Sequence, residues 1–296
     1  MADVTSTILA PFIPTIVANT ALEILRSNIV IAGVCTKDTD VAAFNVGDTL
    51  NIPFPGTFVA NDKVANSPVT LQVPTATTTS VVLNKHKEAS FLLEDRGAAL
   101  ANQNVLELYT KAAIIPIVEQ IESDLFGLYS SFTNTTGTGG TNLNYATLVA
   151  TRKLMNDNKV SKLNRYLAIS DKDEAALLGD TTMIPYFQYG NANALVDGNL
   201  PSIAGFKLLP SQLVPFNINT KNLAFDPGAL ILATRGLPAA PSGSGANSAV
   251  VTDPISNITL RATVAYSAAF LGVQVTIDIL YGVAKLRNEK AVVVLS

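Results

Sequence analysis

The sequence predicts an α+β fold, and three observations lead to this prediction. Hydrophobic residues recur every three or four positions between residues 105 and 132, a spacing typical of a long helix. Hydrophobic and polar residues alternate at 47–56 and again at 273–279, a pattern typical of strands with one buried face. No segment of the chain repeats another, so these helices and strands are expected to form one mixed fold.

The first forty residues predict a helix followed by a strand. Residues 15–27 are expected to be helical because their hydrophobic side chains fall on one face, namely those of Val17, Ala21, Leu22 and Leu25. The run IVIAGV at 29–34 is expected to form the strand. Cys35, the only cysteine, follows this run and is expected to be a buried thiol rather than a nucleophile.

Residues 47–87 predict a long two-stranded arm. In the outgoing strand Leu50, Ile52 and Phe54 alternate with polar residues, and Pro53 suits a strand at a sheet edge. The following segment is polar and rich in turn residues, and the returning strand, TTTSVVLNKHK, is rich in Thr and Val. Because an isolated two-stranded hairpin is only marginally stable in water, such an arm needs something to cover it.

The arm is expected to lead, from Phe91 onward, into a single helix of roughly 30 residues or more. The stretch TNTTGTGGTN at 133–142 is expected to end this helix in a flexible turn. Further helices are expected at 145–159 and 171–179 and, as a short one, from Asp226. Strands are expected at 165–170, 205–211, 256–267, 273–282 and 291–296, with a mobile surface loop at 238–249.

The composition is hydrophobic for a soluble monomer. Charged residues make up 15% of the 296 residues and hydrophobic residues 48%, whereas about 25% charged residues is usual. No hydrophobic run reaches the length of about 20 residues that a membrane span needs, and the net charge of −3 does not indicate a nucleic-acid surface. The start of the chain lacks the positive flank of a secretory signal, so we expect use in a cytosol.

The motifs of common enzymes are missing from the sequence. His86 is the only histidine and lies between two lysines, so a metal site built on histidines is excluded and a polar strand residue is expected. No G-x-S-x-G motif occurs, and the glycines at 137–140 lack the Lys-Ser/Thr that a phosphate-binding loop requires. We therefore expect no enzyme activity, no catalytic residue, no cofactor and no metal site.

Two acidic groups have structural interpretations. At 170–174 Ser170 is expected to cap a helix, Asp173 to close a capping box, and the remaining acids to lie at the positive end of the helix dipole. In the long helix, the acids are expected to form a solvated face; they are Glu119, Glu122 and Asp124.

An arm that needs cover and a body poor in charge together favour burial against other copies of the chain. Here the order of elements resembles the major capsid protein of tailed bacteriophages, which has the Hong Kong 97-type capsid fold. The resemblance lies in the hairpin that starts at GDTLNIPFP, the passage EDRGAALA into a long helix, the unit with DKDEAALL, and the segment GFKLLPSQLVP. It extends over essentially the whole chain, although none of these short motifs is highly specific.

The resemblance implies a division of the chain into an N-terminal arm, an extended loop, a spine helix, a peripheral domain and an axial domain. The expected ranges are 1–43 for the N-terminal arm and first strand, 44–90 for the extended β-hairpin loop, 91–178 for the spine helix and peripheral domain, 179–260 for the axial domain, and 261–296 for the returning C-terminal strands.

The implied function is structural: self-assembly into the icosahedral shell that encloses the double-stranded DNA of a tailed phage. The partners would be the chain itself in pentamers and hexamers, with a separate scaffolding protein, a portal and a decoration protein as further partners. DNA would be enclosed without sequence-specific binding, no membrane would be involved, and the shell would assemble in the host cytoplasm and become part of the virion. The expected contacts between subunits are Phe58, Asn61, Asp62, Lys63, Glu94, Arg96, Ser242 and Gly243.

Alternatives remain open at this point. An encapsulin-like nanocompartment that encloses a cargo enzyme would have the same fold, and an enzyme with an unrecognised site or a tail-tube or decoration protein would have another. Some members of the resembled family form Lys-Asn crosslinks, for which Lys63 beside Asn61 and Asp62 is a candidate, although a plain polar turn explains these residues equally well.

Overall fold

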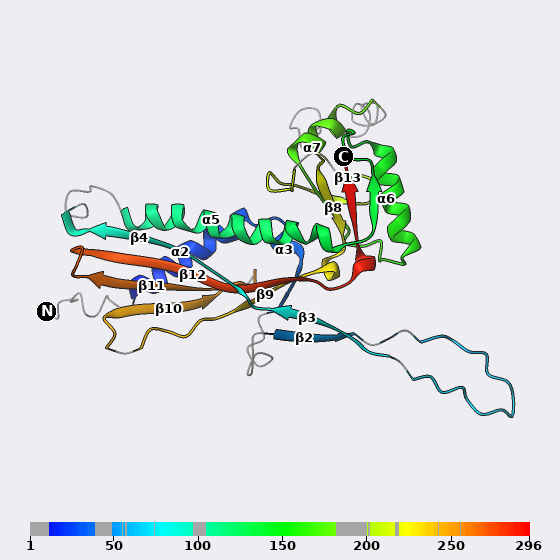
Figure 1. Cartoon of the computed structure of the whole chain (residues 1–296), viewed down its shortest axis with the longest axis horizontal. Coiled ribbons are helices and arrows are strands. Elements are labelled where there is room, and N and C mark those ends of the chain that lie inside the picture. The colour runs from blue at the N-terminus through cyan, green and yellow to red at the C-terminus, as the bar shows by residue number, and fades with distance from the viewer. Residues whose placement is uncertain are drawn as a thin grey trace.

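The computed structural model describes residues 12–38, 49–54, 56, 58–73, 75–96, 105–181, 200, 202–216, 219–241, 243–254 and 256–296. Two bodies and a projecting arm make up the described chain (Figure 1). An elongated body is built on a six-stranded sheet, and a smaller body is built on a five-stranded sheet. We call them the large-sheet body and the small-sheet body.

The large sheet has the order β1-β9-β12-β11-β10, and β4 also pairs with β12. Only the β1–β9 pair is parallel. The central strand, β12, is the longest, and its residues Val275, Ile277 and Ile279 are buried as the sequence predicts, although Asp278 is buried as well. The strands are β1 (Thr36–Asp38), β4 (Lys85–Glu94), β9 (Leu230–Arg235), β10 (Ala246–Thr252), β11 (Thr259–Ser267) and β12 (Gly272–Lys285).

Two helices, α2 (Phe12–Asn28) and α5 (Val105–Gly127), pack against the large sheet and against each other. The face of α2 predicted from the sequence is buried in this core, as are Ile114, Val118, Ile121 and Leu125 of α5. After α5 the chain continues as the short 3-10 helix η2 (Leu128–Ser131). Cys35 is buried in the same core, as expected, and burial raises the pKa of its thiol to about 12.

Two expectations about the large-sheet body are wrong. Ile31–Val34 form helix α3 instead of a strand, because a side chain from α5 accepts the N–H groups at its start. Phe91 belongs to β4, where it pairs with Val275, because alternate residues of this segment face the helices and the solvent. The described part of the long helix is α5, with 23 residues, and residues 97–104 of the expected helix lie outside the described residues.

The small sheet has the order β5-β13-β8-β6-β7 and a core of its own. Its strands are β5 (Thr135–Gly137), β6 (Tyr166–Ile169), β7 (Lys207–Pro210), β8 (Lys221–Phe225) and β13 (Ala291–Leu295), and its helices are α6 (Tyr145–Asp157) and α7 (Asp171–Leu178). The strand β5 lies where the sequence predicts a flexible turn, because its backbone pairs with β13. Asn144 caps α6 and Ser170 caps α7 through their side chains.

Asp173 differs from the expected capping-box residue. Its carboxylate is fully buried and accepts hydrogen bonds from Ser170 Oγ at 3.0 Å, Asn222 Nδ2 at 2.6 Å and Ser296 Oγ at 2.7 Å. These partners lie before α7, on β8 and after β13. Asp173 therefore joins three elements of the small sheet instead of closing the first turn of one helix.

The region after Asp226 is mostly strand. The expected short helix is only the 3-10 turn η3 (Pro227–Ala229), and β9 follows it directly. Likewise β10 begins at Ala246, inside the range expected to be a mobile loop, because it pairs along β11. A third 3-10 turn, η4 (Asn288–Lys290), connects β12 to β13 and so connects the two bodies.

The sheets group the chain differently from the expected domain ranges. The elements α6, β6 and α7 belong to the small-sheet body, although the sequence placed them with the spine helix. Conversely β9 and β10 belong to the large-sheet body, although their ranges were placed in the axial domain. The reason is that strands distant in sequence complete each sheet, and the chain passes from β12 in the large sheet to β13 in the small sheet.

The arm begins as the two-stranded ladder of β2 (Thr49–Phe54) and β3 (Thr77–Val82), paired from Thr49↔Val82 to Phe54↔Thr77. Residues 58–73 extend beyond it without strand pairing, and Figure 1 shows them pointing away from both bodies. The returning segment is interrupted at Leu83 and Asn84 and continues as β4 in the large sheet. The regular hairpin is therefore shorter than the sequence predicts.

Candidate assembly surfaces

The outer part of the arm exposes hydrophobic side chains that none of the described residues covers. Leu71 and Val73 are 87% and 92% exposed, and Phe58 is 65% exposed. Exposed side chains of this size are costly when they gather in one place and are typical of surfaces that meet a partner. The exposed set consists of Phe58, Val59, Val64, Val69, Leu71 and Val73.

The tip of the arm is held in shape by its own polar groups. Lys63 Nζ donates to the carbonyl of Val64 at 2.6 Å and to the carbonyl of Ser67, and the hydroxyl of Ser67 donates to Val64 at 2.8 Å. Asn66 takes a positive φ of 61°, which this residue type tolerates in a turn. Of the predicted contacts, Asn61 and Asp62 directly precede this tip, and the ammonium of Lys63 is used within it. Phe58 lies nearer the base of the arm, next to Val59, whose backbone bonds to Gln72 on the returning segment.

The base of the arm is anchored to the large sheet. Leu50, Val81 and Leu83 pack against Ile231 and Ala233 of β9 in a small separate core. On the outer side of this core, the guanidinium of Arg287 lies 4.7 Å from the ring centroid of Phe54. The root of the arm is thus fixed, whereas its outer half is bare.

Gly282 permits the close approach of the arm to β12. A Cβ atom at this position would lie 2.2 Å from the carbonyl oxygen of Val82, which is far closer than any real contact. Only glycine therefore allows the end of β3 to cross β12 at this point.

A polar triad fixes the joint between the arm and α5. Asp124 forms an ion pair with the ammonium of Lys85 at 2.8 Å, and it accepts a hydrogen bond from the hydroxyl of Tyr281 at 2.6 Å. Burial alone would raise the pKa of Asp124, but these two donors and Gln120 hold it below its usual value. Burial, and then the bond to Asp124, raises the pKa of Tyr281. Asp124 is therefore a structural ion-pair partner and does not belong to a solvated face as the sequence predicts.

His86 lies beside this joint, on β4. Its Nε2 is 2.9 Å from Oδ2 of Asp278, and the same carboxylate accepts Arg261 Nε at 3.0 Å and Nη2 at 2.6 Å. Because Asp278 is almost completely buried and His86 is 51% exposed, the pair tethers a surface strand to β12. His86 is thus a strand residue with a structural contact, in line with the sequence prediction.

Glu122 is the clearest departure from the expected solvated face. Its side chain is buried, and its carboxylate accepts the backbone N–H groups of Val30 at 2.8 Å, Ile31 at 3.0 Å and Ala32 at 2.9 Å. Burial raises the pKa of Glu122, and the three N–H donors oppose that rise. Of the three acids predicted to face the solvent, only Glu119 is exposed.

The far end of the large sheet carries a second exposed hydrophobic group. Phe270 and Leu271 form the turn between β11 and β12 and are largely exposed. The turn is tied to the end of β4 by the bond from Asp95 N to Leu271 O at 2.9 Å and by the bond from Tyr266 to Asp95 at 2.8 Å. The predicted contacts Glu94 and Arg96 flank Asp95 and are exposed.

The remaining predicted contacts lie in the loop before β10. Gly243 has a positive φ of 84°, and no atom lies within 4 Å of where its Cβ would be, so the loop is open at this point. Ser242 lies outside the described residues. The sequence did not identify the far-end turn at Phe270 and Leu271, although two adjacent hydrophobic residues beside a glycine are a recognisable signal.

Two of these surfaces, the outer part of the arm and the turn at Phe270 and Leu271, expose hydrophobic side chains. Within the described ranges, no three His, Cys, Asp or Glu side chains are placed to hold a metal ion. None of the described helices is both long enough and apolar enough to cross a membrane.

Comparisons with known proteins agree with this geometry. The family model described as Phage capsid protein matches residues 130–237. A solved structure titled "Mycobacterium phage Che8" is 16% identical with a TM-score of 0.63, covering 90% of this chain and 90% of that chain. The capsid structure of the cyanophage P-SCSP1u is 14% identical with a TM-score of 0.66, covering 90% of this chain and 87% of that chain.

The same fold also occurs in a virus-like particle from Pyrococcus furiosus, with 10% identity, a TM-score of 0.55, and coverage of 95% of this chain and 98% of that chain. No curated protein sequence matches the chain. The described chain therefore has the Hong Kong 97-type capsid fold, and residues 130–237 within it match the phage capsid protein family.

Proposed function

We propose that the chain is the major capsid protein of a tailed phage and that its copies assemble into a closed icosahedral shell around double-stranded DNA. The observation that carries this proposal is the arm, whose outer half exposes six hydrophobic side chains and points away from both bodies. A second copy is the simplest cover for such an arm. The match to the phage capsid protein family and the shared fold support the same conclusion.

Within this proposal the large-sheet body is the peripheral domain and the small-sheet body is the axial domain. The extended loop is the arm at 49–82, and α5 is the spine helix. The loops of the small-sheet body would meet at the five-fold and six-fold centres, and the arm would lie over a neighbouring subunit. These assignments replace the ranges expected from the sequence, because they follow the two sheets.

The partners follow from the assembly. The chain would bind itself in pentamers and hexamers, with a separate scaffolding protein, a portal and a decoration protein as further partners. It would enclose DNA without reading its sequence, would assemble in the host cytoplasm, and would have no enzyme activity. Each contact between subunits would be weak, and closure of the shell would multiply the weak contacts as in any multivalent system.

A cellular shell that encloses a cargo enzyme is the second candidate function. It is favoured by one observation, the shared fold with a virus-like particle from Pyrococcus furiosus. The match of residues 130–237 to the phage capsid protein family favours the phage function over it.

Imaging separates these functions. Purified protein, examined by negative-stain electron microscopy, should form closed shells of uniform size, and nuclease-protected DNA should be recovered from shells purified from their natural source. Shells of the same fold that contain protein cargo and no DNA would favour the cellular compartment. A preparation without shells or rings under any assembly condition would contradict both functions.

A further inference from the structure

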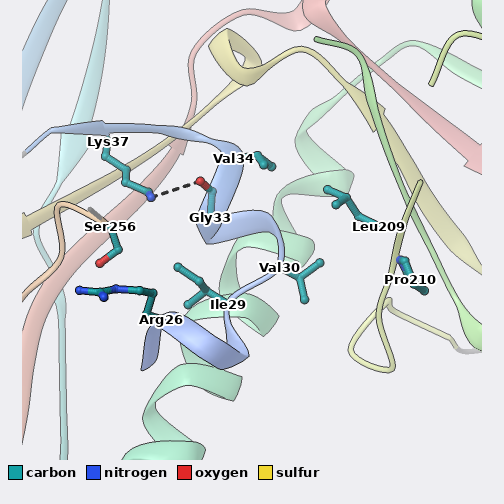
Figure 2. Close-up of a pocket in the computed structure, with 9 residues that line it drawn as sticks. All are labelled: Arg26, Ile29, Val30, Gly33, Val34, Lys37, Leu209, Pro210 and Ser256. Atoms are coloured by element: carbon teal, nitrogen blue, oxygen red, sulfur yellow. Dashed lines mark hydrogen bonds between the residues drawn. The ribbon is translucent and has the colours of Figure 1, made fainter. Parts of the chain in front are cut away.

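A pocket of about 490 Å³ lies where the end of α2, the helix α3 and the strand β7 meet (Figure 2). It is separate from the arm and from the contact surfaces described above. Figure 2 shows Arg26, Lys37 and Ser256 on one side, and Leu209 and Pro210 on the other. The pocket thus has a polar side and a hydrophobic side, which is completed by Ile29, Val30 and Val34.

Ser256 supplies an unused polar group. The residue is 2% exposed, and its backbone N–H donates to Asp253 Oδ2 at 2.9 Å. Its hydroxyl has no hydrogen-bond partner among the described residues. Because a buried hydroxyl without a partner is unfavourable, a ligand that accepts its proton would be favoured at this position.

Lys37 supplies a positive charge to the lining of the pocket. Its ammonium donates to the carbonyl of Gly33 at 3.3 Å, the bond drawn in Figure 2. It forms no ion pair with any residue that the structure describes. The side chain is only partly exposed, and burial lowers its pKa. An anion placed beside this ammonium would add a direct ion pair to the more distant attraction of Asp253 and Glu122.

Arg26 completes the polar side. Its Nε and Nη2 donate to the carboxylate of Asp253, so the third nitrogen of the guanidinium, Nη1, is left for another acceptor. The carboxylate of Glu122 attracts Lys37 from a distance but is occupied by three backbone N–H groups. The lining itself therefore holds two bases and no acid, and the acid that pairs with Arg26, Asp253, lies outside it.

We propose that this pocket binds a carboxylate carried on a short aliphatic stem. A monoanion would give the ammonium of Lys37 a direct ion-pair partner, and the donors of Arg26, Lys37 and Ser256 match the oxygens of a carboxylate. The hydrophobic wall would pack against the aliphatic stem. A compact ion such as phosphate would leave this wall uncovered. This inference does not depend on shell assembly, because all nine lining residues belong to one chain.

The first test uses 4-methylpentanoate as the probe, with 4-methylpentanamide as a neutral molecule of the same shape. Saturation-transfer difference NMR suits it because this method works on subunits and on large assemblies alike. The acid should bind, and the amide should bind at least about tenfold more weakly because it lacks the charge. Equal binding of acid and amide, or no binding of the acid, would overturn the proposal.

Variants locate the binding. Ser256→Ala removes a buried hydroxyl without a partner, so it should leave thermal stability unchanged or raise it, and it should weaken binding of the acid about fivefold to tenfold. Lys37→Gln should weaken binding of the acid about tenfold. Lys153→Gln is the control, because Lys153 lies on α6 and pairs with Asp157. An acid that binds Ser256→Ala and Lys37→Gln as tightly as the parent protein would overturn the assignment of the site.

Two further competition measurements identify the ligand class and its source. Inorganic phosphate should fail to displace the acid, whereas displacement at equal concentration would show a general anion site and contradict the proposal. The blocked peptide acetyl-Leu-Glu-Leu-amide should displace the acid if the carboxylate comes from a polypeptide, with the glutamine analogue inactive. If neither peptide displaces the acid, the source is a small free acid.

Discussion

The carboxylate of Glu122 accepts the backbone N–H of Ile31 at 3.0 Å across the interface between α5 and α3. The N–H groups of Val30 and Ala32 complete the same cluster, at 2.8 and 2.9 Å. A short helix has N–H groups at its start without partners of their own, and here a side chain from a distant helix satisfies them. This contact fixes the corner between α2 and β1, and with it one wall of the pocket at Lys37.

Replacing Glu122 should therefore destabilise the large-sheet body strongly. Glu122→Ala leaves three buried N–H groups without an acceptor, and we expect a loss of at least about 3 kcal/mol in the free energy of unfolding. Glu122→Gln keeps one acceptor oxygen and should lose less. Chemical denaturation of the purified protein measures both, with the exposed neighbour substituted in Glu119→Ala as the control. Equal effects at the two positions would contradict the structural role of Glu122.

The ion pair of Asp124 with Lys85 should make stability depend on acidic pH. Because the pKa of Asp124 is lowered in the folded state, the unfolded chain binds more protons in this window and stability falls as pH falls. The contribution is complete above the unfolded pKa of about 3.9 and disappears below the folded value. Thermal unfolding between pH 6 and about pH 2 should show a smaller loss in Asp124→Asn than in the parent protein. If the unfolding temperatures of the two proteins fall equally with pH, the ion pair of Asp124 with Lys85 does not contribute to stability.

Gly282 and Gly127 form a matched pair for the arm root. Alanine at 282 would place its Cβ 2.2 Å from the carbonyl of Val82, whereas alanine at 127 would meet no atom within 4 Å. We expect Gly282→Ala to cost about 2 kcal/mol or more and to expose the arm to limited proteolysis. Gly127→Ala should be neutral or stabilise by up to about 1 kcal/mol. An arm that remains protected in Gly282→Ala would show that this crossing is not tight.

Replacing Asp278 should lower the stability of the fold far more than replacing His86, which it contacts. Asp278→Ala leaves Arg261 without its carboxylate, and we expect a loss of about 2–3 kcal/mol. His86→Ala removes a contact from a half-exposed side chain and should cost less than about 1 kcal/mol. Thermal unfolding of the two variants decides the order. A larger effect of His86→Ala would mean that this histidine has a role beyond tethering β4.

The bare arm predicts a variant that folds but does not assemble. Leu71 and Val73 are 87% and 92% exposed, so replacing both with aspartate should leave thermal unfolding of the subunit unchanged. The same change should prevent shells, because two charges would be buried at each contact. Leu71→Met with Val73→Ile, which keeps the hydrophobic surface, is the control. Shells of normal yield from the aspartate variant would show that this part of the arm is not an interface.

Much of the fold could be predicted from local patterns. The face of α2 formed by Val17, Ala21 and Leu25 follows helical spacing, and the hydrophobic residues of β12 from Val275 to Ile279 are buried as expected. The cap of α7 at Ser170 follows from a short polar residue before an acidic first turn. These features depend on residues close together in the sequence, and the resemblance in element order supplied the overall fold.

The failures share one physical cause, which is contact between distant residues. The run IVIAGV favours a strand by composition, yet Glu122, about ninety positions later, stabilises a helix at Ile31–Val34. The glycine-rich stretch near Gly137 becomes a strand because β13 lies beside it. Similarly, Phe91 fits either a helix or a strand locally, and pairing with Val275 decides between them. A local sequence pattern cannot identify a contact partner that lies far away in the sequence.

Sedimentation velocity of the purified protein tests the central claim most directly. Under assembly conditions the protein should sediment as large closed particles built from copies of the 31.1 kDa chain, and the aspartate variant of the arm should remain a small species. A parent protein that stays a single 31.1 kDa molecule, with its arm resistant to protease, would contradict the account.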